Sequence, residues 1–174
     1  MTAAEVFESV TGSGSTDFAL LASVLNRHGR WCLIGGLAVN CYVEPVYTLD
    51  ADIVVAVSVI DAIKRDLAAA GFSIQGFPHS INVQMKGSQL RIQLTTDLRY
   101  QEFLDDTNQL EVLGEQVPVA SIANVTRGKI WAWNDQTRRP TKRKKDELDL
   151  MRILEAYPEL RNSMPEEINR QVPE

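Results

Sequence analysis

Two stretches decide the fold that this sequence predicts: Leu33-Ile-Gly-Gly-Leu-Ala-Val-Asn40 and Thr48-Leu-Asp-Ala-Asp-Ile-Val-Val55. The first joins an apolar run of strand length, residues 31–34, to one or two helical turns through a Gly-Gly pair. The second begins with acidic residues and continues with β-branched and apolar ones, which is typical of a central strand over residues 50–57. The predicted order is strand, Gly-Gly turn, short helix, loop and strand.

The carboxylates of the second stretch, Asp50 and Asp52, stand two residues apart on the predicted strand. Side chains at this spacing point to the same face, so the two groups converge. Two negative charges at such a short distance are unfavourable unless a cation neutralises them. Mg²⁺ suits such a site because it takes hard oxygen ligands from one or two carboxylates and completes its shell with water and substrate phosphates. The pair therefore predicts a Mg²⁺ site.

The Gly-Gly turn, Gly35 and Gly36, predicts a phosphate contact. Without Cβ atoms its backbone amides can approach a phosphate, and the N-terminus of the helix that follows favours anions. Neither feature is specific by itself. Their conjunction is more informative, and it indicates a nucleoside triphosphate bound with Mg²⁺.

Helices are expected on both sides of these stretches. A helix capped by Thr16 or Asp17 ends at Gly29, and a serine-x-x-acid cap at Ser58 and Asp61 starts another. Ser121 caps a third helix that runs to about residue 133. A basic loop through Pro140 leads to a last helix with Leu150, Leu154 and Tyr157 on its inner stripe.

Five further strands are expected, at residues 72–75, 81–85, 89–94, 110–113 and 116–119. Lys86-Gly87-Ser88 forms the hairpin turn between the second and third of these. Pro118 belongs on an edge strand, because proline cannot donate a ladder hydrogen bond.

Composition indicates one soluble globular domain, since 44% of the 174 residues are hydrophobic and 24% are charged. The polar break after Thr11 defines a flexible leader over residues 1–15. The domain itself covers residues 16–160, and residues 161–174 form a polar tail that is expected to be partly disordered.

The sequence shows neither a secretion signal nor a run approaching the roughly 18 apolar residues of a membrane span. A cytoplasmic location without membrane contact is expected. Cys32 and Cys41 flank the Gly-Gly turn and are interpreted as buried thiols rather than a disulfide. His28 and His79 are isolated and predicted to lie on the surface or in loops.

The order of strand, Gly-Gly, short helix and Thr-x-Asp-x-Asp resembles that of the polymerase-beta-like nucleotidyltransferases. The nearest resemblance is to the abortive-infection toxin nucleotidyltransferases and to small stand-alone enzymes that adenylylate antibiotics. It covers roughly residues 18–155, with residues 31–57 the diagnostic part. The resemblance implies an α/β (α+β) fold with a mixed central sheet flanked by helices, and C-terminal helices.

The resemblance also implies roles for individual residues. Gly35 and Gly36 would contact the triphosphate of an NTP substrate. Asp50 and Asp52 would be catalytic, as ligands of the divalent metal, Mg²⁺ or Mn²⁺. The toxin-like relatives carry a lysine in a later helix, matched here by Lys129, and then a Lys-Asp-x-x-Asp pattern, matched by residues 145–149.

Lys129 lies on the inward stripe of its helix, since Ile122, Val125, Lys129 and Trp133 follow spacings of three, four and four. An inward lysine needs an anionic partner or a route to solvent. A triphosphate is one such partner. A salt bridge to Asp146 or Asp149 on the neighbouring helix is the other, and the sequence leaves both open.

Although the net charge is −5, six of the 18 basic residues fall within eight positions. These are Arg138, Arg139, Lys142, Arg143, Lys144 and Lys145. One interpretation is a solvated loop between helices. The other is a landing site for a polyanion such as RNA, held through phosphate contacts. Trp131 and Trp133 could stack on a base, although packing in the core or at a partner interface is commoner.

The pattern departs from active nucleotidyltransferases at two positions. A third carboxylate is usual on a later strand, but Gln93 stands in the matching context, and an amide oxygen is a weak Mg²⁺ ligand that cannot act as a base. Asp97 would lie about 13 Å further along an unbroken strand, too far to substitute. Val46 replaces the usual basic residue two positions before the threonine.

Two hypotheses follow. The first is an enzyme that transfers a nucleoside monophosphate from an NTP to an acceptor, which could be RNA, a protein or a small molecule. The second is a catalytically degenerate relative that binds nucleotide or serves as a regulatory partner. A weaker third is the antitoxin-like partner of a neighbouring toxin.

Overall fold

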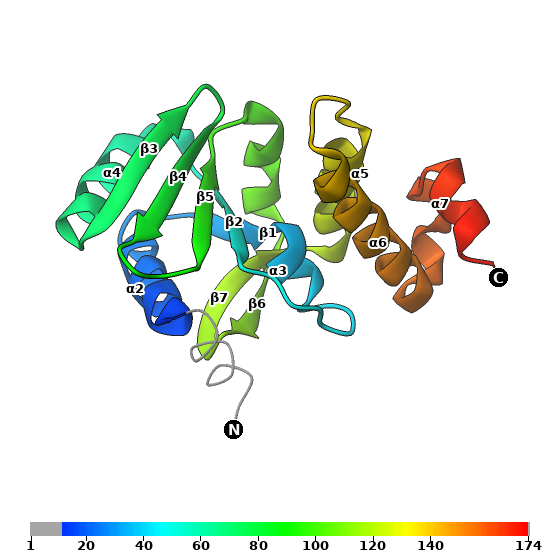
Figure 1. The fold of residues 1–174 in the computed structure, drawn as a ribbon, viewed down its shortest axis with the longest axis horizontal. Helices are drawn as coiled ribbons and strands as arrows, with labels where there is room; N and C mark the ends of the chain where they lie inside the picture. Colours follow the sequence, from blue (N-terminus) through cyan, green and yellow to red (C-terminus); the bar gives the residue numbers. More distant parts are fainter. Residues whose placement is uncertain (1–11, 174) are drawn as a thin grey trace.

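A seven-stranded mixed sheet forms the centre of the computed structural model, which describes residues 12–173 (Figure 1). The strands are β1 (Trp31–Ile34), β2 (Asp50–Val55), β3 (Phe72–Phe77), β4 (Ser80–Met85), β5 (Arg91–Thr95), β6 (Thr107–Val112) and β7 (Glu115–Ala120), in the order β3-β4-β5-β2-β1-β7-β6. Strand β2 runs antiparallel to β1 and parallel to β5. It therefore lies inside the sheet, as its β-branched sequence predicts.

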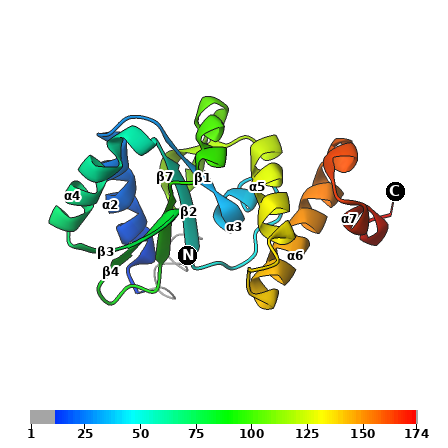
Figure 2. The ribbon, with the colours of Figure 1, turned by 90° about the horizontal axis from the view of Figure 1, so that it is seen from above.

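Helices cover both faces of the sheet. They are α2 (Gly14–Asn26), α3 (Gly35–Val39), α4 (Ile60–Ala69), α5 (Ile122–Asn134), α6 (Pro140–Ala156) and α7 (Glu166–Gln171). Three 3₁₀ segments lie in the connections: η1 (Val57–Val59) before α4, η2 (Leu98–Asp105) between β5 and β6, and η3 (Pro158–Ser163) between α6 and α7. Helices α2 and α4 lie together on one side of the sheet, whereas α3, α5 and α6 lie on the other (Figure 2). The predicted α/β fold with a mixed sheet and C-terminal helices is confirmed.

The core follows the predicted apolar patterns. Phe18 and Leu21 of α2, Ile53 of β2 and Leu150 of α6 are all fully buried. Ser121 is the N-cap of α5, and its hydroxyl accepts a hydrogen bond from the Asn124 amide. The side-chain periods of two and 3.6 residues thus identify most elements correctly.

Three local expectations are wrong. Val59, not Ser58, is the N-cap of α4 and makes no side-chain cap hydrogen bond, because η1 turns the chain before the helix begins. Pro118 lies on the interior strand β7, next to the edge strand β6; β7 tolerates it because its pairing with β1 is short, around Leu33 and Val119. Helix α2 has Ser13 as its N-cap, not Thr16 or Asp17. The predicted basic loop, in contrast, ends as expected at Pro140, the first residue of α6, where the fixed φ of proline suits a helix.

The C-terminal segment also differs from the expected polar tail. Residues 158–171 form η3 and α7, and Met164, Ile168 and Val172 are buried. Apolar residues spaced by four place one face of this segment against α6. At the other end, residues 1–11 of the predicted leader lie outside the described residues, and α2 begins at Gly14, inside the expected leader.

No helix in the described part of the chain is long and apolar enough to cross a membrane. Both cysteines are free thiols; Cys32 is buried as expected, whereas Cys41 is only partly buried. Burial raises the pKa of Cys32 to about 12 and that of Cys41 to about 11.

Candidate functional site

Strand β2 brings Asp50 and Asp52 to the face of the sheet that carries α5 and α6. Asp50 pairs in register with Arg91 of β5, and Asp52 pairs with Gln93 of the same strand. Both aspartates line a cavity of about 560 Å³ between the sheet and α6. The predicted convergence of the carboxylates therefore takes place at a cavity.

Asp50 is held by two cations. Arg91 Nε donates a hydrogen bond to Asp50 Oδ1 at 2.7 Å, and Lys142 Nζ donates one to Oδ2. Burial favours the neutral acid, but Lys142 and Arg91 outweigh it and lower the pKa of the Asp50 carboxyl. This carboxylate is charged and compensated by the protein itself.

Asp52 differs, because its carboxylate accepts no hydrogen bond and forms no ion pair with any residue in the range 12–173. Burial raises the pKa of Asp52, and the nearby Asp50 charge raises it further, while Lys129 opposes both. Two such neighbouring oxygens without a protein donor fit a hard cation such as Mg²⁺. Within the described residues no group of three or more His, Cys, Asp and Glu side chains shares an ion site. The Asp52 oxygens are therefore open to a cation, whereas both Asp50 oxygens already accept hydrogen bonds from Arg91 and Lys142.

Gly35 makes room for Asp52. Its φ is +71°, in the left-handed region that favours glycine, and a Cβ at this position would lie 2.2 Å from Asp52 Oδ2. Gly36 is less restricted, since its Cβ would meet Thr48 Oγ1 at 3.7 Å and Asp149 Oδ2 at 3.9 Å. Glycine is therefore favoured at the two positions for different reasons. At Gly35 it allows the close approach of a carboxylate, and at Gly36 it leaves space in the lining of the cavity.

Lys129 projects inward from α5 and is 8% exposed. Its Nζ lies 3.0 Å from Asp146 Oδ1 and 2.7 Å from Asp149 Oδ2, both on α6. Burial disfavours the charged amine, but Asp149 and Asp146 outweigh that effect and raise the pKa of Lys129. The structure thus shows the salt-bridge partners that the sequence left open, while Lys129 still lines the cavity.

Two arginines extend this buried ion pair. Arg138 Nε donates to Asp146 Oδ2 at 2.7 Å, and Arg152 Nη1 donates to Asp149 Oδ1 at 2.6 Å. Arg152 also bonds Asn40 Oδ1 at 3.0 Å, at the end of α3. The network ties α5, α6 and α3 together around the carboxylates.

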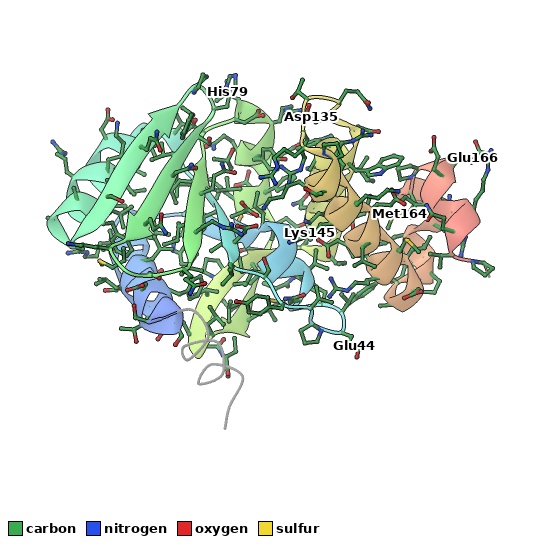
Figure 3. The ribbon with its side chains drawn as sticks, viewed as in Figure 1. Glu44, His79, Asp135, Lys145, Met164 and Glu166 are labelled. Atoms are coloured by element: carbon green, nitrogen blue, oxygen red, sulfur yellow. The ribbon has the colours of Figure 1, made fainter. Side chains whose placement is uncertain are left out.

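The basic run belongs mostly to the first turns of α6 and is not a uniform solvated loop. Arg138 and Lys142 reach into the site, whereas Arg143 bonds the Trp133 carbonyl. Lys145 lies on the side of α6 that faces the sheet (Figure 3) and lines the cavity. No residue of the described chain forms a hydrogen bond or ion pair with the Lys145 amine.

The two tryptophan side chains contact other side chains of the protein. Trp131 stacks on Phe103 with ring centroids 5.6 Å apart and meets the edge of Tyr100 at 5.1 Å. Arg99 also lies over its ring. Trp133 Nε1 donates to Glu147. Of the two interpretations, core packing is the one that these contacts support.

Gln93 occupies the position beside Asp52 on the neighbouring strand. Its amide nitrogen donates to Ser80 Oγ at 3.4 Å and to Asn82 Oδ1 at 3.3 Å. Asp97 does not replace it, because the chain leaves the strand at Thr95 and Asp97 caps η2, bound to Arg99.

The sequence did not single out Arg91 as a site residue, and it named Lys142 only within the basic run. A signal for Arg91 was present in the sequence. It stands two residues before Gln93 on the same predicted strand, so the two side chains point to the same face. The contact of Lys142 with Asp50, across 92 positions, has no local signal.

No family model and no curated protein matches this chain. Among solved structures, the antibiotic-resistance factor ANT(2'')-Ia matches with a TM-score of 0.62 at 10% identity, covering 88% of this chain and 94% of that chain. The lincosamide antibiotic adenylyltransferase LnuA matches with 0.53 at 12% identity, covering 78% and 94%. ANT(2'')-Ia also has a structure in complex with adenylyl-2''-tobramycin.

A third match is an antigenic nucleotidyltransferase-like protein from Paracoccidioides brasiliensis, with a TM-score of 0.55 at 16% identity, covering 83% of this chain and 76% of that chain. At these identities the matches concern the fold. The chain has the nucleotidyltransferase fold, which the sequence predicted.

Proposed function

We propose that this chain, which has a nucleotidyltransferase fold, transfers a nucleoside monophosphate from an NTP to an acceptor with the help of Mg²⁺ or Mn²⁺. The observation that carries the proposal is the unpaired Asp52 carboxylate, set beside Asp50 and against Gly35 in a cavity of about 560 Å³. A volume of this size is typical of small-molecule sites. The name of LnuA, an adenylyltransferase, and the complex of ANT(2'')-Ia with adenylyl-2''-tobramycin support the reaction class.

Asp50 and Asp52 would hold the metal ion, which when bound supplies positive charge against the phosphates. Arg91 and Lys142, which neutralise Asp50, would limit the repulsion between this carboxylate and an incoming triphosphate. Gly36 leaves the cavity floor open beside Thr48. Lys129, paired with two aspartates, would fix the position of α6 and add positive potential at the same place.

The cations of α6 would orient the triphosphate. Lys145 has no partner within residues 12–173, and Arg138 uses its Nε on Asp146 while its side chain stays 37% exposed. Charge-assisted hydrogen bonds from such groups are the strong contacts that phosphates accept. The same basic residues are our candidates for contacts with an RNA acceptor, alongside protein and small-molecule acceptors.

Nucleotide binding without transfer is the second candidate, and Gln93 favours it. An amide next to Asp52 cannot accept a proton from an acceptor, and it is a weaker metal ligand than a carboxylate. A regulatory or antitoxin-like role would require only the binding half of the site.

Calorimetry with each NTP, with and without Mg²⁺, tests the binding half of the proposal. We expect Mg²⁺-dependent binding that Asp52→Asn weakens by about tenfold or more, as for loss of a charged ligand. Glu167→Gln, on the exposed side of α7, is the matched control and should bind normally. Equal binding by the wild-type protein and Asp52→Asn would contradict the metal site.

Nucleotidyl transfer itself is measured by the release of pyrophosphate and by the incorporation of label from an α-³²P NTP into the acceptor. If the wild-type protein binds the triphosphate but labels no acceptor, whereas Gln93→Asp does, the second candidate is correct.

A further inference from the structure

The wall of the cavity beside Asp52 is neutral. Asn82 of β4 and Gln93 of β5 line it, and they bond to one another. Ser80 and Thr95 continue the same wall into an outer hollow, which Gln93 and Arg138 share with the main cavity. An acceptor that approaches Asp52 from this side therefore meets amides, hydroxyls and a guanidinium.

A hydroxyl acceptor must lose its proton during transfer, and a positioned base normally takes it. The carboxylates of the cavity are already occupied: Asp50 is bound by Lys142 and Arg91, and Asp146 and Asp149 are bound by Lys129. Asp52, together with Asp50, would hold the metal ion in the proposed function. None of these groups is available to take a proton from an acceptor.

Three groups of the outer hollow remain. The Asp135 carboxylate accepts hydrogen bonds from the Thr137 hydroxyl and amide, which lower the pKa of Asp135 and make it a weak base. Asp97 is bound by Arg99, whose hydrogen bonds to the carboxylate lower the pKa of Asp97 and make it a weak base. His79 lies at the turn between β3 and β4 (Figure 3), exposed and outside the main cavity. In the outer hollow, His79 is the candidate base whose contacts do not argue against proton transfer, and a His79 variant tests this role directly.

Cationic side chains, in contrast, lie around the path by which an acceptor would reach Asp52. Arg91 is 57% exposed although its Nε bonds Asp50, and Arg138 lies between the two hollows. Lys145 adds a third charge on the main cavity. An acceptor with an anionic oxygen would be attracted here and would need no base, because a phosphate monoester is largely dianionic at neutral pH, with a second pKa near about 6.

Resting on the proposed function, we infer that the acceptor is a phosphate group rather than a hydroxyl. A phosphate oxygen of the acceptor attacks the α-phosphorus of the NTP, and the bond from this phosphorus to the oxygen that bridges to the β-phosphorus breaks. A P–O–P anhydride forms and pyrophosphate leaves with the bonding electrons. No proton has to be removed from the acceptor.

The test compares acceptors that differ only in a phosphate. Wild-type protein with Mg²⁺ and each α-³²P NTP is given glycerol 3-phosphate or glycerol, and RNA with a 5′-phosphate or a 5′-hydroxyl and a blocked 3′ end. We expect the phosphorylated member of at least one pair to be labelled about 100-fold faster or more, the scale of a missing base. The two pairs distinguish a small phosphomonoester from a nucleic acid end, and ³¹P NMR identifies the anhydride.

Equal or faster labelling of the hydroxyl acceptors would overturn the inference. So would absence of label on both phosphorylated acceptors in a protein that binds the triphosphate. Failure of the proposed function looks different, because calorimetry then shows no Mg²⁺-dependent triphosphate binding at all.

Two variants sharpen the result. Gln93→Asp places a base and a negative charge beside Asp52, so labelling of hydroxyl acceptors should rise by about 100-fold and labelling of phosphates should fall. His79→Gln should leave both rates within about twofold of wild type. If His79→Gln lowers labelling by about 100-fold, a base is at work and the inference is wrong.

Discussion

Gly35 and Asp52 form a pair in which each residue depends on the other. The left-handed backbone at Gly35 and the missing Cβ let the Asp52 carboxylate lie against the main chain. That position is also where the carboxylate has no donor from the described residues. A charged group without a protein partner costs stability, and such costs are typical of sites that bind something.

Gly35→Ala is expected to destabilise the protein and displace Asp52. A left-handed backbone costs an alanine about 1–2 kcal/mol, and the contact of 2.2 Å with Asp52 Oδ2 adds to it. Urea unfolding measures the loss. Gly36→Ala is the matched control and should be neutral or slightly stabilising, since its Cβ makes ordinary contacts within a helix. Equal effects of the two variants would contradict the geometry at Gly35.

Asp52→Asn should make the protein more stable near neutral pH while weakening metal-dependent binding. The folded-state pKa of Asp52 is raised, so its ionisation penalises the folded state above the unfolded pKa, and the penalty disappears at lower pH, where both states are protonated. We expect a gain of about 0.5–2 kcal/mol near pH 7 that vanishes by about pH 3.

Asp50→Asn is the control, and it should change the free energy of unfolding in the opposite direction. The pKa of Asp50 is lowered in the folded protein, so the ionised group stabilises the fold above its unfolded pKa, and this stabilisation is lost as the pH falls. The asparagine variant should therefore be less stable than wild type near pH 7. Urea unfolding of both variants across this pH range gives the comparison, and changes of the same sign at Asp50 and Asp52 would contradict the assigned environments.

At the scale of elements, α5 and α6 are joined by charge as well as by packing. Lys129 of α5 lies between Asp146 and Asp149 of α6, and Arg138 and Arg152 bind the outer oxygens of these aspartates. Every buried charge in this group has a partner of opposite sign. This arrangement holds α6, with its cavity-facing lysines, at a fixed distance from β2.

Lys129→Met should therefore cost about 3–5 kcal/mol of unfolding free energy, because it leaves two buried carboxylates with one arginine each. Denaturant unfolding checks this value. Lys144→Met is the control: Lys144 is 75% exposed, pairs with Glu147 three residues away, and should change stability by less than about 0.5 kcal/mol. A loss below about 1 kcal/mol at Lys129 would show that packing alone holds the two helices.

At the scale of the whole molecule, charge is distributed unevenly. The net charge is −5, yet Arg91, Lys129, Arg138, Lys142 and Lys145 all line one cavity. The surface as a whole does not attract polyanions, so an anion would be drawn to this cavity by local potential. The α7 segment, expected as a loose tail, packs its apolar face on α6 and belongs to the same folded body.

Triphosphate binding should accordingly weaken with salt. Between about 0.05 and 0.5 M NaCl we expect the dissociation constant to rise about tenfold or more, because the Debye length falls from more than 10 Å to less than 5 Å. Calorimetry at several salt concentrations measures it, with an uncharged nucleoside as the control ligand. A salt-independent dissociation constant would argue against the cationic cavity as the phosphate site.

The sequence by itself determined the parts of the fold that depend on neighbours along the chain. The Gly-Gly turn, the two aspartates on one face of β2 and the Ser121 cap were all predicted correctly, because strand and helix periods act over a few residues. The same reasoning placed Lys129 on an inward stripe, and it placed Gln93 on a strand, on the face opposite Ile92 and Leu94.

Only the tertiary structure decided which groups meet across the chain. Arg91 lies 41 positions from Asp50 and Lys142 lies 92 positions away, and their contacts depend on sheet order and on where α6 packs. Ion pairs and aromatic contacts of this kind have no local periodicity. For that reason the sequence could identify the carboxylates, whereas the difference between a compensated Asp50 and an unpaired Asp52 required the folded molecule.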